Sequence, residues 1–275
     1  MEGAVLITGA ATGFGSLTAR LAHQRGWKVA ATARRPERVA SPQEARERWL
    51  VLALDVTDEG SVKKAVAAAI ERFGSLSAVV NNAGISTFCS AEEEEEEALR
   101  DVLETNFFGA ARVTRELLPH FRARGAGRVV FVSSQWGRTG VPGFSAYCAS
   151  KFALEGYAEA LFQETAPQGI AVTLVEPGAF DTGFGARSLS VSPKVTDPRS
   201  PYRRLYRALG ESFARESNPT GEPVAEAILD VLSAPAPPLR VVVGEEARAW
   251  SEARFRPEEE AFLGRLAREK GWRER

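Results

Sequence analysis

The sequence is poor in the residues that build disulfides and metal centres. Among its 275 residues it has two cysteines and two histidines. Cys89 and Cys148 cannot form a disulfide framework, and such low cysteine usage makes a reducing cytoplasm the expected location. With only His23 and His120, neither a histidine-rich metal site nor a Ser-His-Asp triad is expected.

Long apolar runs and an excess of one charge are also missing. No run approaches the length of a membrane span, and the acidic start of the chain does not suit a signal peptide. The net charge of -1 gives no general attraction to nucleic acid or to an anionic membrane. The composition, 44% hydrophobic and 26% charged, is that of a globular protein. Because no linker or internal repeat divides the chain, we expect a single domain over 1–275.

Short apolar strands alternate with helical segments along most of the chain. This alternation predicts a doubly wound, Rossmann-like parallel sheet of about seven strands flanked by helices in an α/β fold. Ligands of such sheets bind beyond the carboxyl ends of the strands. The expected strands are 4–7, 28–33, part of 49–56, 76–80, 128–132, 169–175 and 239–243, with helices over 16–24, 61–73 (Ser61 as N-cap), 92–124, 146–166, 202–215 and 224–233.

A glycine-rich turn follows the first expected strand and leads into a helix. Its spacing is Gly9-x-x-x-Gly13-x-Gly15, which differs from the commoner Gly-x-Gly-x-x-Gly. Strand, glycine turn and helix together aim backbone N–H groups at a phosphate. We therefore interpret the turn as the phosphate site of a dinucleotide, and a plain structural turn is the alternative.

Two arginines, Arg34 and Arg35, follow the second expected strand. At this position an acid accepts a hydrogen bond from the adenosine ribose, whereas an arginine accommodates a 2′-phosphate. The absence of the acid favours NADP over NAD. The alternative is that both arginines solvate a loop.

Tyr147 and Lys151 are four residues apart, so that they share one face of a helix. A lysine ammonium favours the phenolate, and we expect the pKa of Tyr147 to be lowered toward the range of a general acid or base. Taken alone, the two could equally form an ordinary surface pair. Cys148 follows Tyr147 but points to another face of the helix, where inert packing is expected.

Several other stretches have less specific patterns. The acidic run 92–97 is expected to be the solvated beginning of a helix, and Asn106 inside that helix could be a tolerated surface amide. Residues 179–216 have the length of a substrate lid. The tail 245–275 is charged and expected to be helical. Apolar lid residues indicate either a hydrophobic substrate or packing of the lid on the body; these are Phe180, Phe184, Leu189, Tyr202 and Leu205.

Taken together and in this order, the motifs resemble those of the short-chain dehydrogenase/reductase family. The resemblance covers 4 to about 182, and the stretch 147–156 is similar to the branch of 17β-hydroxysteroid and retinol dehydrogenases and their bacterial relatives. The matching motifs are Thr8-Gly9-x-x-x-Gly13-x-Gly15, Asp55, Asn81-Asn82-Ala83-Gly84, Asn106, Ser134, Tyr147-x-x-x-Lys151 and Pro177-Gly178 with Thr182 downstream.

The resemblance implies a role for each matching residue. Tyr147 would be the general acid or base, Lys151 would lower its pKa and hold the nicotinamide ribose, and Ser134 would bind the substrate oxygen. Asn106 would anchor a water that passes protons to Lys151. The residues expected to contact the cofactor are Gly9, Thr12, Gly13, Phe14, Gly15, Arg34, Arg35, Asp55, Val56, Asn82, Ala83, Gly84, Tyr147, Lys151, Pro177, Gly178 and Thr182.

The expected function is therefore that of an NADP(H)-dependent oxidoreductase acting on a small carbonyl or secondary alcohol. A catalytically silent nucleotide-sensing or scaffold protein of the same fold is the main alternative. A nucleotide-sugar epimerase or dehydratase is less expected, because the chain lacks an evident larger substrate domain. Helices 92–124 and 146–166 resemble the family's dimer faces, so a homodimer or homotetramer is expected.

Overall fold

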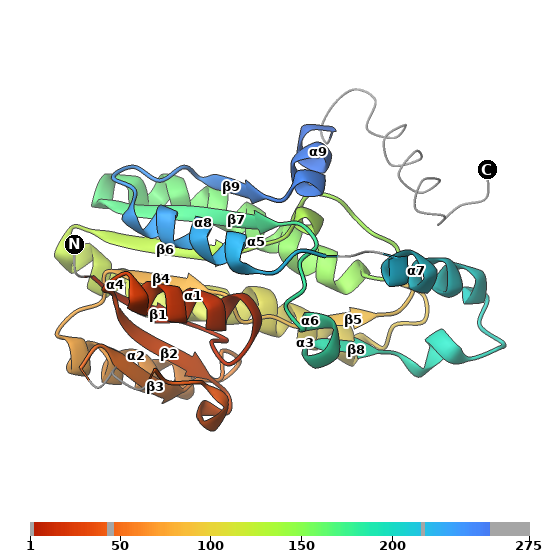
Figure 1. Ribbon diagram of the computed structural model, residues 1–275, viewed down its shortest axis with the longest axis horizontal. Helices are drawn as coiled ribbons and strands as arrows, with labels where there is room; N and C mark the ends of the chain where they lie inside the picture. The colour runs from red at the N-terminus through yellow and green to blue at the C-terminus, as the bar shows by residue number, and fades with distance from the viewer. Residues whose placement is uncertain (1–2, 43–46, 216–217, 254–275) are drawn as a thin grey trace.

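A seven-stranded parallel sheet forms the centre of the computed structural model, which describes residues 3–42, 47–215 and 218–253 (Figure 1). The strand order is β3-β2-β1-β4-β6-β7-β9, and every pairing is parallel. The predicted doubly wound sheet is confirmed. The strands are β1 Ala4–Ile7, β2 Lys28–Ala33, β3 Trp49–Ala53, β4 Ala78–Asn81, β6 Gly127–Val132, β7 Ile170–Pro177 and β9 Arg240–Val243.

The first strand shows why the strands are apolar throughout. All four residues of β1 are buried, and alternate side chains enter opposite faces of the sheet. Ala4 and Leu6 join the core on one face, while Val5 and Ile7 join the core on the other. Helices cover both faces, so neither face of the strand can be polar.

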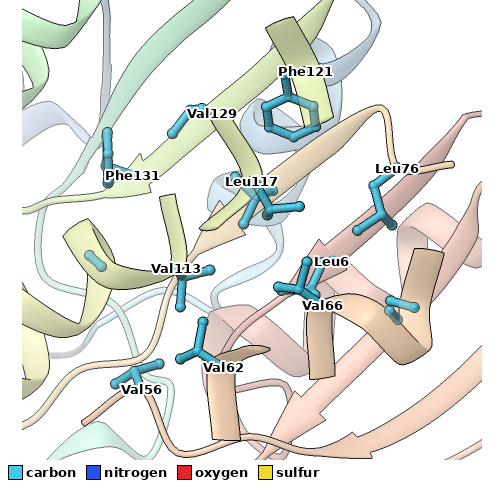
Figure 2. Packing of buried hydrophobic residues seen from close by; sticks show 14 of the residues in the cluster. Leu6, Val56, Val62, Val66, Leu76, Val113, Leu117, Phe121, Val129 and Phe131 are labelled. Atoms are coloured by element: carbon cyan, nitrogen blue, oxygen red, sulfur yellow. The ribbon is translucent and has the colours of Figure 1, made fainter. Parts of the chain in front are cut away.

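Helices α2, α4 and α5 pack on the face of Leu6, where Figure 2 shows Val62 and Val66 of α2 and Val113 and Leu117 of α4 around it. Helices α1 and α8 pack on the opposite face. None of the helices in the described residues is both long and apolar enough to cross a membrane. These helices are α1 Gly13–Gln24, α2 Glu59–Phe73, α4 Gly109–Arg124, α5 Ser145–Thr165 and α8 Glu222–Ser233.

Two expectations about helix beginnings are wrong. Asp58, and not Ser61, caps α2, because its carboxylate accepts the backbone N–H of Ser61. The helix expected over 92–124 begins at Glu96 and then continues to Arg124, through α3 Glu96–Leu103, a π-helical turn Glu104–Phe108, and α4. Most of the acidic run therefore precedes the helix.

The segment 179–215 extends beyond the carboxyl ends of the strands, at the right of Figure 1. It has more regular structure than its sequence indicates: α6 Phe184–Arg187, β8 Leu189–Val191, a short 3₁₀ turn Pro193–Thr196, and α7 Arg203–Arg215. Strand β8 pairs with β5 Ser86–Phe88 in a second, two-stranded sheet. Helix α9 Glu245–Ala253 follows β9, and 254–275 of the expected helical tail lies outside the described residues.

Candidate active site

The glycine-rich turn between β1 and α1 is held by Thr8 and Asn82. Thr8 Oγ1 accepts the backbone N–H groups of Asn82 and Ala83, each at 3.0 Å. Asn82 Nδ2 donates to the carbonyl oxygens of Thr8 at 2.9 Å and Gly9 at 3.2 Å. A Cβ at Gly15 would lie 2.4 Å from Asn82 Nδ2, so glycine is required there. Asn82 thus positions the turn from the neighbouring strand.

The N-terminus of α1 fits a phosphate group. Its N-cap residue, Thr12, makes no side-chain capping hydrogen bond, and the first turn carries no acid. The first N–H groups of the helix are therefore available to an anion. Thr182 lies opposite, 3.4 Å from the position of a Cβ at Gly13, and Phe14 packs edge-on against Phe180 with centroids 5.9 Å apart. The turn and the beginning of the 179–215 segment therefore face each other.

The residues at the ends of β2 and β3 have different surroundings. Arg34 and Arg35 are exposed directly after β2. The Asp55 carboxylate accepts hydrogen bonds from Thr57 N at 3.0 Å and Thr57 Oγ1 at 2.8 Å. Val56 is buried in the core, where its side chain leaves no space for a Cβ at Gly109. Asp55 therefore holds a local turn, while the arginines remain accessible to a ligand.

Ser134, Tyr147 and Lys151 come together where β6 ends beside α5. The Ser134 hydroxyl lies beside the Tyr147 phenol and favours its ionised form. Lys151 is buried, and its Nζ donates to the Val132 carbonyl oxygen at 2.8 Å and lies 5.5 Å from the centroid of the Tyr147 ring. Ser134 Oγ also accepts the Trp136 backbone N–H at 3.1 Å. A hydroxyl pair beside a buried amine can transfer a proton to or from a bound oxygen.

Burial controls the ionisation of Tyr147 and Lys151. Desolvation raises the pKa of Tyr147, and the neighbouring Ser134 hydroxyl opposes that rise. Desolvation likewise lowers the pKa of Lys151 to about 8, against the influence of the Glu155 carboxylate. The expectation that the pKa of Tyr147 is lowered is therefore wrong for the protein alone, because desolvation is the largest influence on this phenol.

Asn106 lies in the π-helical turn and is 1% exposed, so it is not a surface amide. Its Oδ1 accepts the Ile85 N–H at 2.8 Å, and its Nδ2 donates to Ile85 O and to Ser150 Oγ, both at 2.9 Å. Ser150 Oγ donates in turn to the Tyr147 carbonyl oxygen at 2.7 Å. Asn106 thus joins the loop after β4, which includes Gly84, to the helix that carries Tyr147.

Pro177 and Gly178 end β7 beside the last strand. Gly178 N donates to Val243 O at 2.8 Å. A Cβ at Gly178 would lie 3.3 Å from Gln135 Oε1 and 3.4 Å from Ala247 Cβ. A side chain at Gly178 would therefore require only a small shift of the Gln135 side chain.

Aromatic residues gather beside Tyr147, and two of them, Trp136 and Phe144, were not anticipated from the sequence. Trp136 and Phe184 contact the Tyr147 ring with centroids 5.9 and 6.1 Å away, and Phe144 lies 4.8 Å from Trp136. The close spacing of Trp136 and Phe144 around the loop after Ser134 was the available signal. Leu189, Tyr202 and Leu205 of the 179–215 segment pack on the same cluster, whereas Phe180 packs in the main core.

Cys148 belongs to this cluster without taking part in the site. It is buried, its Sγ accepts the Val141 N–H at 3.4 Å, and burial raises the pKa of its thiol to about 11. A thiol in this state is a poor nucleophile, in agreement with the expected packing role.

Comparison with known proteins places these features in one family. The family model described as short chain dehydrogenase matches residues 3–190. The chain is 36% identical to Oxidoreductase BOA17 of Botryotinia fuckeliana, over 88% of each chain. It is also 36% identical to human 17-beta-hydroxysteroid dehydrogenase type 1, over 88% of this chain and 77% of the relative. A solved short-chain dehydrogenase from Streptomyces avermitilis matches with a TM-score of 0.79 and 36% identity, covering 98% of this chain and 94% of that one.

Proposed function

Because the chain belongs to the short-chain dehydrogenase/reductase family, whose members use nicotinamide cofactors, we propose that it is an NADP(H)-dependent oxidoreductase. It interconverts a carbonyl group and a secondary alcohol. The observation that carries this proposal is the meeting of Ser134, Tyr147 and Lys151 at the end of β6, at the same edge of the parallel sheet as the open N-terminus of α1.

The cofactor, when bound, supplies or accepts the hydride. In reduction the Tyr147 hydroxyl gives its proton to the substrate oxygen, and in oxidation it takes that proton back. The Ser134 hydroxyl holds the same oxygen and polarises the carbonyl. The Lys151 ammonium stabilises the phenolate that remains on Tyr147 after reduction, and Asn106 keeps α5 in place beneath the tyrosine.

The cofactor assignment follows the surroundings of each residue. Gly9, Thr12, Gly13 and the beginning of α1 receive the pyrophosphate, because that turn has uncapped N–H groups and no acid. The exposed Arg34 and Arg35 receive a 2′-phosphate. The other residues take the positions beside the turn or at neighbouring strand ends; these are Phe14, Gly15, Asp55, Val56, Asn82, Ala83, Gly84, Pro177, Gly178 and Thr182.

The substrate is apolar next to its reacting oxygen. Trp136, Phe144 and Phe184 form the surroundings of Tyr147, and such a surface favours a hydrophobic ketone or alcohol. The segment 179–215 serves as the lid over this site. The similarity to a hydroxysteroid dehydrogenase supports the same substrate class.

Turnover of NADPH with hydrophobic and small ketones, measured at 340 nm, tests the proposal. Tyr147→Phe removes only the ionisable hydroxyl and should lower kcat by about 10²–10⁴-fold, while NADPH binding, followed by fluorescence, stays close to that of the unaltered protein. Equal turnover by the variant contradicts the mechanism. Cofactor binding without turnover on the whole panel favours a nucleotide-sensing or scaffold role.

We also propose that the chain assembles as a homodimer or homotetramer through the outer faces of α4 and α5. Phe108, at the beginning of α4, is 50% exposed, and Phe152 on α5 is 37% exposed. Large exposed aromatic side chains are common at subunit interfaces. A cytoplasmic location suits the two free, buried cysteines Cys89 and Cys148.

A further inference from the structure

Helix α5 presents a third polar side chain on the face of Tyr147 and Lys151. Glu155 follows Lys151 by four residues, so the three side chains lie one above another along the helix. Each of them reaches the end of β6. Tyr147 lies beside Ser134, Lys151 Nζ donates to the Val132 carbonyl oxygen, and the Ser133 hydroxyl donates to Glu155 Oε1 at 2.5 Å.

Glu155 is 6% exposed, and both of its carboxylate oxygens accept hydrogen bonds. Arg240 of β9 donates to its Oε2 from Nε at 3.2 Å and from Nη2 at 3.1 Å. Arg240 also pairs with Glu176 of β7 at 3.0 Å, and Arg138 lies 3.7 Å from the same Glu176. Buried carboxylates are costly unless they are paired, so this network requires a compensating role or a very good geometry.

The members of the network adjoin the proposed site along the chain. Ser133 directly precedes Ser134, and Glu176 directly precedes Pro177 and Gly178. The network therefore connects β6, β7 and β9 to α5 behind the reacting groups. A Cβ at Gly137 would lie 2.7 Å from Ser133 Oγ, so the loop after Ser134 also packs closely on it.

The charge of Glu155 acts on Lys151. Burial lowers the pKa of Lys151, and the Glu155 carboxylate raises it. Burial raises the pKa of Glu155 itself, while the hydrogen bond from Ser133 and the nearby Arg240 oppose that rise. Other titratable or charged groups face Lys151 and Glu155 from every surrounding element. Tyr147 and Glu159 lie on α5, Glu176 on β7 and Arg240 on β9. Arg138 lies in the loop after Ser134, and Glu246 of α9 is connected through Gln135.

We infer that Glu155 is a positioning residue for the proposed reaction: its hydrogen bond with Ser133 holds Ser133, and therefore Ser134, against α5. This inference rests on the proposed function. Without the carboxylate, Lys151 loses its proton at lower pH and the phenolate of Tyr147 loses its counter-charge.

Glu155→Gln tests the inference, with Glu159→Gln as the matched control. Both variants remove a carboxylate that contacts Arg240 from the same helix, but the Glu159 side chain is 54% exposed. In the pH profile of kcat for ketone reduction, Glu155→Gln should move the alkaline limb to lower pH by about half a unit or more. It should also lower kcat several-fold with KM and NADPH affinity little changed. Glu159→Gln should leave the profile in place.

Ser133→Ala and Tyr147→Phe keep the inference testable even if Glu155→Gln does not fold. Ser133→Ala leaves all charges in place and should fold, and it should lower kcat several-fold at unchanged KM even if Glu155→Gln proves unstable. Unaltered kcat in Ser133→Ala, or an unmoved alkaline limb in a folded Glu155→Gln, overturns the inference while Tyr147→Phe still reports on the proposed function. Full activity of Tyr147→Phe overturns both.

Discussion

Loss of water sets the protonation of individual residues at the site more strongly than charge pairing does. Burial raises the pKa of Tyr147 and lowers that of Lys151, even though the Lys151 ammonium nitrogen lies 5.5 Å from the centre of the tyrosine ring. In the protein alone the tyrosine is therefore a protonated phenol. That form is the one required of a general acid in carbonyl reduction.

Glu176 makes the stability of the protein depend on pH. Burial and the neighbouring Glu155 raise the pKa of Glu176 to about 7. The folded state then holds this proton more tightly than the unfolded state, so its contribution to stability is complete below pH 4.5 and is lost as the pH rises through 7. Glu176→Gln should lack this loss, which is on the order of 2 kcal/mol.

Thermal unfolding between pH 4.5 and pH 8 measures the effect. As the pH rises over this range, the Tm of Glu176→Gln should increase by roughly 4 °C relative to the Tm of the unaltered protein. A pH-independent difference would mean that Arg138 and Arg240 keep Glu176 ionised throughout.

Arg34 is the residue through which we propose that the chain prefers NADPH to NADH. Its guanidinium is exposed directly after β2, where a 2′-phosphate would lie, and Arg34→Asp replaces attraction by repulsion. The variant should bind NADPH at least ~10-fold more weakly, about 1.4 kcal/mol, with NADH binding spared or improved. Arg122→Asp, also an exposed arginine but on α4, is the control and should change neither affinity. Tighter binding of NADH than of NADPH by the unaltered protein would contradict the assignment.

At the level of elements, the acidic run is divided between two roles. Glu96 and Glu97 form the exposed first turn of α3, as expected, whereas Glu92 and Glu93 contact the 179–215 segment. Glu93 Oε2 accepts hydrogen bonds from Tyr206 at 2.7 Å and Ser200 at 2.8 Å, both in the 179–215 segment. Glu92 accepts the Tyr202 hydroxyl. These contacts join the loop after β5 to the beginning of α7. They give the acids a structural role that their clustering in the sequence does not indicate.

Glu93→Ala should therefore loosen the 179–215 segment, which we propose to be the lid. Its loss leaves the hydroxyls of Tyr206 and Ser200 without this acceptor, so KM for hydrophobic ketones should rise several-fold while kcat changes less. Limited proteolysis should cut the 179–215 segment faster. Glu97→Ala, in the same acidic run but exposed on α3, should behave as the unaltered protein. Equal KM and equal cleavage in Glu93→Ala would show that the lid is held by its apolar contacts alone.

For the whole molecule, assembly through α4 and α5 is the prediction to test. Phe108 packs on Phe107 with centroids 4.9 Å apart and still exposes half of its surface. Phe108→Glu combined with Phe152→Glu would bury two charges in such an interface and should give a monomer by light scattering. Val191→Glu is the control, since Val191 is 52% exposed on β8 outside these helices. A monomeric unaltered protein refutes the prediction.

The fold of the whole molecule could be predicted because its information is local. The wholly apolar strand 4–7 and the alternation of strands with helices predict a sheet covered on both faces, and all seven strands of that sheet are found. The helix expected over 92–124 is present from Glu96, but the π turn within it was not predicted, because the partner of Asn106 is distant in the sequence. Asn106 bonds both backbone groups of Ile85, across 21 residues, and the helix forms a π turn there.

The same distinction applies to the site. The sequence by itself determined that Tyr147 and Lys151 share a helix face, since a separation of four residues settles this, and that a glycine turn joins β1 to α1. Only the tertiary structure decided that Glu155 meets Arg240, 85 residues away, and that Trp136 packs against the tyrosine. It also decided the direction in which the pKa of Tyr147 shifts. Spacing along a helix is written in the chain, whereas desolvation arises only when distant segments pack together and exclude water.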